Sequence, residues 1–219
     1  MSYEREKEKP QLTPAAACKG PVSAPGWSVH ESENALLDGV STTCRFFSRT
    51  PRGAITEIFA MKLFTQVLLD DLAAKAIESP RGRAHHNIHA TAADPLQRFF
   101  VVANRQSYIR PHRHRTKFEL AMVLRGRFDV VTFDDEGTVT GRWTIGDGSS
   151  TVGYESPSMT WHTLVARTDG SAFLEVKEGP YDPLVASEFA TWAPAEGDPE
   201  AEACLYWLRA AQPGDRFAG

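Results

Sequence analysis

Between residues 96 and 178 the chain alternates short apolar segments with turn-forming residues, and this alternation restricts its fold more than any other feature. The segments are rich in β-branched and aromatic residues, as is typical of strands. They span residues 96–103, 118–126, 127–134, 138–145, 161–166 and 172–178. Between them lie stretches such as "DDEG", "GDGSS" and "TDG", in which glycine tolerates positive φ and aspartate bonds its own backbone. Six or more short strands with regular turns predict a β-sandwich or a closed barrel.

Helices are expected on both sides of these strands. In "MKLFTQVLLDDLAAKAIES" the apolar residues recur at helical spacing opposite charged ones, and Pro80 follows, which predicts a helix over residues 65–78. Near the C-terminus, "GDPEAEACLYWLRAA" starts with proline and acidic residues, which favour a first helical turn. This pattern predicts a second helix over about residues 199–211.

The first 60 residues differ from the rest of the chain. Proline, serine, alanine and glycine are scattered there between charges without a sustained period, which is typical of a flexible extension. We therefore expect a poorly ordered extension over residues 1–60 and one folded domain over residues 61–212, with the barrel at about 96–178.

Composition narrows the classes of partner. The chain has 219 residues, of which 42% are hydrophobic and 24% charged, and its formal net charge is -4. This charge offers no basic field for nucleic acid or an acidic membrane. The three cysteines form no closely spaced pair, and no apolar run is long enough to cross a membrane. We therefore expect a cytoplasmic protein that binds neither nucleic acid nor membrane.

The segment "RPHRHRTKFELAMVLRG" carries the most informative spacing. His112 and His114 are two residues apart, so on an extended chain both imidazoles project from one face. Glu119 follows on the next predicted strand, and Gly126 is expected to end that strand in a tight hairpin. The simpler alternative is a basic, polar turn between two strands. His162, at the start of a later strand, favours a metal site, because three imidazoles and one carboxylate suit Fe, Mn, Ni, Zn or Cu.

These positions resemble the two motifs of the cupin superfamily. His112, His114, Glu119 and Gly126 match H-x-H-x4-E-x6-G, and Pro157 with His162 matches P-x4-H. Met159 stands where many cupins have glycine, and Ala166 where an asparagine is common. The resemblance implies a mainly β chain with a single small cupin-type β-barrel, a jelly roll also called a double-stranded β-helix.

A narrower resemblance covers about residues 61–210. Six segments are similar to sequences of the WbuC family of small cupin-fold metalloproteins: "SPRGRAHHNIH", "DPLQRFF", "YIRPHRH", "WHTLVA", "EVKEGPYDP" and "FATWAPAEG". That family is often associated with gene sets for bacterial surface polysaccharide. The resemblance implies a metal-binding barrel and a link to polysaccharide assembly.

Other residues are candidates for the walls of a pocket. His85, His86 and His89 are predicted to share a loop before the first barrel strand, where His86 would transfer protons while His85 and His89 contact substrate. Lys177 and Glu178, at the end of a strand, are the other predicted catalytic groups, and Glu175 shares a face with Lys177. Arg98, Arg110 and Tyr181 are the remaining predicted substrate-binding residues. The alternatives are loop-capping hydrogen bonds, a surface salt bridge and solvated strand ends.

The functional expectation is a small enzyme with one divalent metal ion on His112, His114, Glu119 and His162. It would isomerise or epimerise a carbohydrate or nucleotide-sugar intermediate of polysaccharide biosynthesis. The alternatives are an Fe(II)-dependent dioxygenase and a metal-stabilised ligand-binding or regulatory module without turnover. The expected partners are a small-molecule substrate and a second copy of the chain in a homodimer.

Overall fold

The structure, a computed structural model, describes residues 27–29, 42–49 and 55–218 and divides into two compact units. In the first unit, strands β1 (Trp27–Val29), β2 (Thr42–Arg49) and β3 (Ile55–Leu63) form an antiparallel sheet in that order. No strand was predicted there, and the remainder of the predicted extension lies outside the described residues. Strand β3 runs through the expected boundary at residue 60, and the second unit takes over at Phe64.

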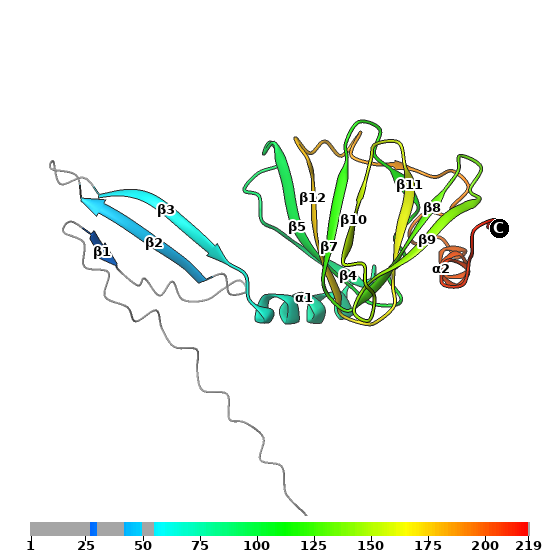
Figure 1. Cartoon of the computed structure of the whole chain (residues 1–219), viewed down its shortest axis with the longest axis horizontal. Coiled ribbons are helices and arrows are strands. Elements are labelled where there is room, and N and C mark those ends of the chain that lie inside the picture. The colour runs from blue at the N-terminus through cyan, green and yellow to red at the C-terminus, as the bar shows by residue number, and fades with distance from the viewer. Residues whose placement is uncertain (1–26, 30–41, 50–54, 219) are drawn as a thin grey trace, which may run out of the picture. The chain divides into compact units, whose positions relative to one another are not determined.

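Two five-stranded antiparallel sheets form the second unit (Figure 1). The first has the order β10-β7-β12-β5-β4 and the second the order β13-β6-β11-β8-β9. The first sheet comprises β4 (Arg83–Asn87), β5 (Leu96–Ala103), β7 (Glu119–Arg125), β10 (Gly153–Ser156) and β12 (Ser171–Glu178). The second comprises β6 (His112–Arg113), β8 (Arg127–Phe133), β9 (Val139–Gly146), β11 (Trp161–Ala166) and β13 (Glu188–Phe189).

The strand pairing identifies the topology. Strand β5 pairs with β12, β6 with β11, β7 with β10 and β8 with β9, so each pair encloses the next along the chain. This nested pairing is that of a jelly roll, the double-sheet architecture to which cupin barrels belong. The predicted fold class, a mainly β cupin-type barrel with a helix before it and another after it, is confirmed.

Because side chains alternate along each strand, the core forms three layers, one between the sheets and one on the outer face of each sheet. Between the sheets, the inward-facing residues form one cluster that includes Val101, Phe128, Leu164 and Phe173. Helix α1 (Gln66–Glu78) packs on the outer face of the first sheet. Helix α2 (Ala201–Leu208) packs on the outer face of the second. Because both faces of each sheet are covered, neighbouring residues on one strand enter different clusters.

Gly126 connects β7 to β8 at φ +72°. These two strands pair with different neighbours in different sheets, so the expected tight hairpin is wrong and Gly126 turns the chain from one sheet to the other. A Cβ atom here would meet the Ser171 and Thr168 hydroxyl oxygens. Both the positive φ and the lack of space therefore require glycine.

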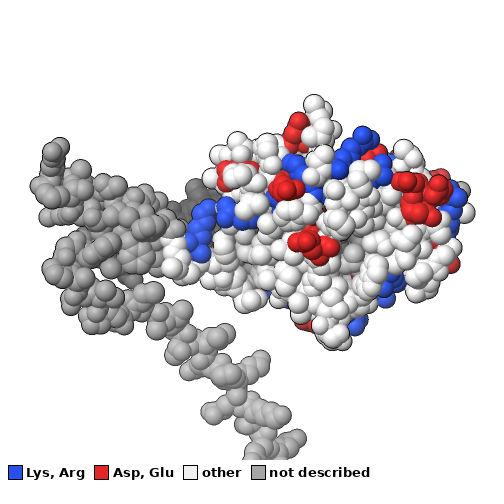
Figure 2. Space-filling view, turned by 45° about the horizontal axis from the view of Figure 1, so that its top comes forward, with Lys and Arg blue, Asp and Glu red and all other residues white. Residues whose placement is uncertain are grey.

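The surface fits the predicted charge balance. On the face drawn in Figure 2, acidic and basic side chains are interspersed among uncharged ones, and neither sign dominates. Within the described part of the chain, neither helix has the length and apolar character needed to cross a membrane.

Candidate metal centre

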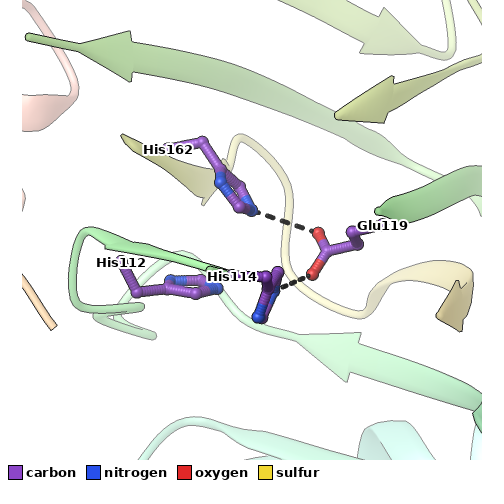
Figure 3. Close-up of side chains that lie close together, drawn as sticks. All are labelled: His112, His114, Glu119 and His162. Atoms are coloured by element: carbon purple, nitrogen blue, oxygen red, sulfur yellow. Dashed lines mark hydrogen bonds and ion pairs between the residues drawn. The ribbon is translucent and has the colours of Figure 1, made fainter. Parts of the chain in front are cut away.

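Four side chains from three strands converge between the two sheets (Figure 3). His112 and His114 come from β6 and the residue after it, His162 from β11, and Glu119 from the start of β7 in the facing sheet. His112 and His162 are direct partners in the β6–β11 register. The donor atoms of the four residues lie within 4.8 Å of one another, and only His112 is more than marginally exposed. The structure therefore brings together all four residues predicted as metal ligands.

Backbone carbonyl groups fix the orientation of the three imidazoles. In each ring, Nδ1 lies within hydrogen-bonding distance of one carbonyl oxygen and donates its proton to it. The partners are Arg110 O for His112 (2.9 Å), Ala186 O for His114 (2.6 Å) and Thr160 O for His162 (2.9 Å). Since Nδ1 carries the proton, the lone pair of each Nε2 is available for a metal ion, as is usual for metal-binding histidines.

The fourth ligand, Glu119, faces two of these nitrogen atoms. Its carboxylate oxygens lie 2.8 Å from His114 Nε2 and 3.3 Å from His162 Nε2. The Tyr154 hydroxyl donates a hydrogen bond of 2.6 Å to the same carboxylate. If each Nδ1 keeps its proton, Nε2 and carboxylate oxygens are all acceptors, and such a cluster needs a proton or a cation at its centre. The donor set of three imidazoles and one carboxylate fits a divalent ion such as Zn, Fe, Mn, Ni or Cu.

The protonation states also fit metal binding. Burial and the nearby His162 lower the pKa of His112 to about 3, so this imidazole is neutral near pH 7. Burial opposes ionisation of Glu119, but hydrogen bonds with His114 and His162 hold its pKa well below the usual value. For His162 burial lowers the pKa, but Glu119 outweighs this effect and raises it. Metal binding at Nε2 competes with protonation of His162, so metal affinity is expected to fall as the pH is lowered.

A short strand holds the histidine-bearing segment from outside. Glu188, on β13, accepts hydrogen bonds from Arg113 Nε at 2.7 Å and from Arg115 Nε at 2.8 Å. These two arginines alternate with His112 and His114, so they point away from the metal centre. Strand β13 pairs with β6, and Ala186 just before it accepts the His114 Nδ1 proton. The segment over residues 186–189 therefore positions two of the four ligands.

Glu188→Gln is expected to weaken metal binding by about tenfold, because loss of an outer partner of a ligand typically costs 10- to 100-fold. The substitution removes the charge that holds Arg113 and Arg115 but leaves every ligand in place. Competition with a chromophoric chelator would measure the affinity. Glu136→Gln, in the exposed turn before β9, is the matched control. Equal affinities of the two variants would show that β13 does not position the site.

A cavity of about 710 Å³ opens from the metal centre, and His112 and Glu119 form part of its wall. Lys177 and Glu175 also line it, and their side chains form an ion pair with Nζ 2.5 Å from Oε1. Lys177 Nζ lies 3.7 Å from Glu119 Oε2 and 5.3 Å from the centre of the Phe99 ring. Burial and the charge of Glu119 raise the pKa of Glu175 to about 7, while the two carboxylates raise the pKa of Lys177 in spite of its burial. The cavity thus has a proton acceptor and a proton donor beside the metal ligands.

Of the residues predicted to surround the site, four line this cavity. They are Lys177, predicted as catalytic, and His85, His89 and Tyr181, predicted to bind substrate. Their positions agree with the predicted roles, which stay predictions.

Strand alternation places two of the predicted catalytic residues, His86 and Glu178, outside the cavity. Residues 83–87 form strand β4 and not the expected loop, so His85 and His86 lie on opposite faces. His86 is the register partner of Phe100, which packs towards helix α1. Glu178 is likewise one residue out of phase with Glu175 and Lys177, and its carboxylate accepts the Phe118 N–H. Neither His86 nor Glu178 lines the cavity.

Two predicted substrate-binding residues also lie outside the cavity. Arg98 is an exposed residue on the outer face of β5, where alternation separates it from the inward-facing Phe99. Arg110 donates a hydrogen bond of 2.7 Å to Ala190 O, and its guanidinium group lies over the Phe189 ring. Arg110 therefore holds the segment after β13 and does not line the cavity.

Two residues of the site were not assigned a role from the sequence, although Glu175 was seen to share a face with Lys177. Glu175 takes the place assigned to Glu178, and its alternation with Lys177 and Phe173 was the available signal. Tyr154 holds Glu119 from β10, a strand that was not predicted. Its role depends on the pairing of Tyr154 with Ala121 on β7, and no local pattern reports that register.

Comparisons with known proteins gave one family model and several solved structures of low sequence identity. A family described as "Domain of unknown function (DUF6016)" matches residues 64–145. A search of curated proteins gave no match. Among solved structures, KdgF from Halomonas sp. is 22% identical with a TM-score of 0.36, over 48% of this chain and 84% of that one. A cupin 2 conserved barrel domain protein from Rhodopseudomonas palustris is 18% identical with a TM-score of 0.38, over 49% and 66%.

A third similar structure is CapF, a capsular polysaccharide assembling protein from Staphylococcus aureus. It is 16% identical with a TM-score of 0.43, and the match covers 51% of this chain and 30% of CapF. The cupin-type fold is thus assigned from the strand pairing of the chain itself, and the resemblance to the WbuC family stays a prediction.

Proposed function

We propose that this protein is a divalent-metal-dependent enzyme that moves a proton on a small carbohydrate or nucleotide-sugar, as in an isomerisation or epimerisation. The observation that carries the proposal is the ion pair of Lys177 and Glu175 in the wall of the cavity, with Lys177 Nζ 3.7 Å from the ligand Glu119. An acid and a base beside a metal centre are the groups that such proton transfers require.

A metal ion at His112, His114, Glu119 and His162 would supply a Lewis acid that polarises a substrate oxygen. The remaining chemistry belongs to the chain. Glu175 Oε1 accepts the proton removed from a substrate carbon, and the buried ammonium group of Lys177 stabilises the negative charge that forms. Lys177 Nζ can then return a proton to the neighbouring carbon or oxygen. Tyr154 keeps Glu119 oriented towards the centre through its hydrogen bond.

The carbohydrate class is supported by the WbuC resemblance, which points to surface polysaccharide, and by the polar cavity wall. The wall carries amide, hydroxyl and imidazole groups that suit a polyhydroxylated ligand, including Asn87, Thr91, Gln97 and His89. A cytoplasmic location and a homodimer stay predictions from the sequence.

Proton transfer can be tested by solvent exchange. The metal-loaded protein would be incubated in D₂O with a panel of aldoses, ketoses and nucleotide-sugars, and ¹H NMR would detect the loss of a carbon-bound proton. Exchange is expected in the wild type and is expected to fall at least about a hundredfold in Lys177→Met, in line with the contribution of general acid–base catalysis. Lys75→Met, on helix α1, is the matched control.

Two outcomes would contradict the proposal. Sugar binding without exchange, equal in the wild type and in Lys177→Met, would indicate a ligand-binding module. Oxygen consumption that depends on iron and substrate, without exchange, would indicate a dioxygenase.

A further inference from the structure

Four cationic or titratable side chains gather in the cavity wall contributed by the α1–β4 turn, strand β4 and the residues that follow it. They are Arg81, Arg83, His85 and His89, all within the sequence "PRGRAHHNIH". None of them is a candidate metal ligand, and the proposed proton transfer does not use them. Their presence in the cavity wall is therefore explained neither by metal binding nor by proton transfer.

Phe99 separates this group from the metal centre. The rings of His85 and His89 both meet the Phe99 ring edge to face, with centroid distances of 6.5 and 6.3 Å. Lys177 Nζ, which adjoins Glu119, lies 5.3 Å from the centre of the same ring. The cavity thus extends past Phe99 from the metal ligands to the two histidines, and a ligand in it can contact both ends.

The acidic partner of this group balances only part of its charge. Glu196 accepts hydrogen bonds from Arg81, at 2.7 Å, and from Arg83. One carboxylate thus faces two guanidinium groups, which leaves a net positive charge. The nearby Asp94 is turned to its own loop, where it accepts bonds from the Thr91 hydroxyl and the Ala90 N–H. Burial and then the charges of Arg81, Arg83 and His86 lower the pKa of His85, as expected in a positive environment.

The donors of these side chains are not all used within the protein. His89 is anchored through Nδ1, which lies close to the backbone nitrogen and oxygen of Arg98, so its Nε2 is left to face a ligand. Arg83 Nη1 donates a hydrogen bond of 3.0 Å to Tyr108 O, which fixes the position of its side chain in the cavity wall. Arg81 has a side chain that is 59% exposed, so it can turn towards an incoming anion.

We infer that Arg81, His85 and His89 form an oxyanion subsite, which binds a phosphate or carboxylate group of the substrate at the end of the cavity away from the metal centre. Guanidinium and imidazole groups recognise both kinds of oxyanion through charge-assisted hydrogen bonds. The inference rests on the proposed function for the identity of the rest of the ligand, a carbohydrate whose oxygen atoms reach the metal ligands. It narrows the substrate to an anionic sugar, such as a sugar phosphate or a sugar acid.

Binding of simple anions tests the subsite independently of turnover. Inorganic phosphate, acetate and uncharged glucose would be titrated into the full chain, both metal-loaded and chelator-treated, while NMR follows the imidazole C–H signals. Phosphate or acetate is expected to shift the signals of His85 and His89 and to raise the pKa of His85. His86, the next residue on β4 but on its outer face, is the internal comparison and is expected to shift less than His85 and His89.

Variants identify the groups responsible. Arg81→Gln and His85→Gln are each expected to weaken anion binding roughly tenfold, the loss expected for one charge-assisted hydrogen bond. Arg98→Gln, an exposed arginine on the outer face of β5, is the matched control and is expected to bind as the wild type does. A preference for phosphate over acetate, or the reverse, would identify the substrate group.

The metal-free arm separates this inference from the proposed function. Anion binding that persists without metal supports the subsite, even if no sugar shows solvent exchange. Binding that disappears with the metal would place the anion on the metal ion and overturn the inference. Equal binding by Arg81→Gln, His85→Gln and the wild type would overturn it as well.

Discussion

Replacing His114 with alanine is expected to lower the affinity for a divalent ion by more than about a hundredfold, since loss of an outer partner alone costs 10- to 100-fold. His114 is 3% exposed, its Nε2 lies 2.8 Å from Glu119, and its Nδ1 is fixed by Ala186 O. No other described side chain of the cluster can take its place, because each of the other three is held by its own hydrogen bonds.

Metal affinity also predicts a change in thermal stability. An ion at one hundred times its dissociation constant stabilises the folded state by about 2.7 kcal/mol. For a chain of this size that should raise the unfolding temperature by roughly 5 to 10 °C. His114→Ala is expected to show no such increase at the same metal concentration. Calorimetric titration with Zn, Mn, Ni and anaerobic Fe(II), followed by thermal unfolding, would measure both quantities.

A matched control distinguishes the loss of a ligand from the loss of any half-buried imidazole of the barrel. His86→Ala removes a histidine from the outer face of β4 and is expected to bind metal as the wild type does. His162→Ala, which removes the ligand on β11 opposite His112, is expected to behave as His114→Ala. Wild-type affinity in His114→Ala would show that the four-residue cluster is not a metal site.

The four ligands could be predicted because their spacing in the sequence corresponds directly to their positions on extended strands. His112 and His114 lie two residues apart on an extended segment, and alternation alone puts both imidazoles on one face. Glu119 and His162 open strands that approach this face, and each strand was visible as an apolar run. The jelly roll follows in the same way, since its long strands have strong local patterns.

The predicted catalytic residues that lie outside the cavity, His86 and Glu178, have a common physical explanation. Strand β12 has Phe173 between the sheets and Leu174 under helix α1, so apolar side chains occupy both of its faces. Alternation then shows that Glu175 and Lys177 share a face, but not which face looks into the cavity. The sequence therefore could not decide between Glu175 and Glu178. The same ambiguity applies to His85 and His86 on β4.

The short strands could not be predicted from local sequence. Strands β6 and β13 have two residues each, and they exist because Arg113 pairs with Glu188 and His112 with Phe189 across more than 70 residues. Such pairing depends on the completed barrel and leaves no periodic pattern. The hydrogen bonds by which Glu188 positions the histidine segment could therefore be found only in the structure.

Replacing Arg142 with alanine is expected to lower the free energy of unfolding by about 3 kcal/mol, more than the other substitutions proposed for this protein. The reason is that it leaves a buried carboxylate without its main partner. Arg142 Nη2 donates to Asp129 Oδ2 at 2.5 Å, and the Asp129 side chain is only 3% exposed. Arg167 lies 3.3 Å from the same carboxylate and would retain part of the pairing. At this size the loss corresponds to an unfolding temperature lower by roughly 10 °C.

The same guanidinium group also completes the C-terminal end of helix α2. It donates to three carbonyl oxygens that have no partner within the helix: Leu208 O at 2.7 Å, Ala211 O at 2.8 Å and Arg209 O at 3.1 Å. Carbonyl groups at a helix end need such donors when they are buried. The substitution should therefore also detach α2, which hydrogen exchange of the helix amides would detect.

Denaturant unfolding of four variants tests these expectations: Arg142→Ala, Asp129→Ala, the double variant and a control. Arg127→Ala, an exposed arginine at the start of β8, is the control and is expected to lie within about 0.5 kcal/mol of the wild type. Asp129→Ala combined with Arg142→Ala is expected to lose less than the sum of the single changes, because the double variant leaves no unpaired buried charge. Metal affinity should stay unchanged in folded Arg142→Ala, since Asp129 faces α2 and not the metal ligands. A loss no larger than that of Arg127→Ala would show that Asp129 is adequately paired without Arg142.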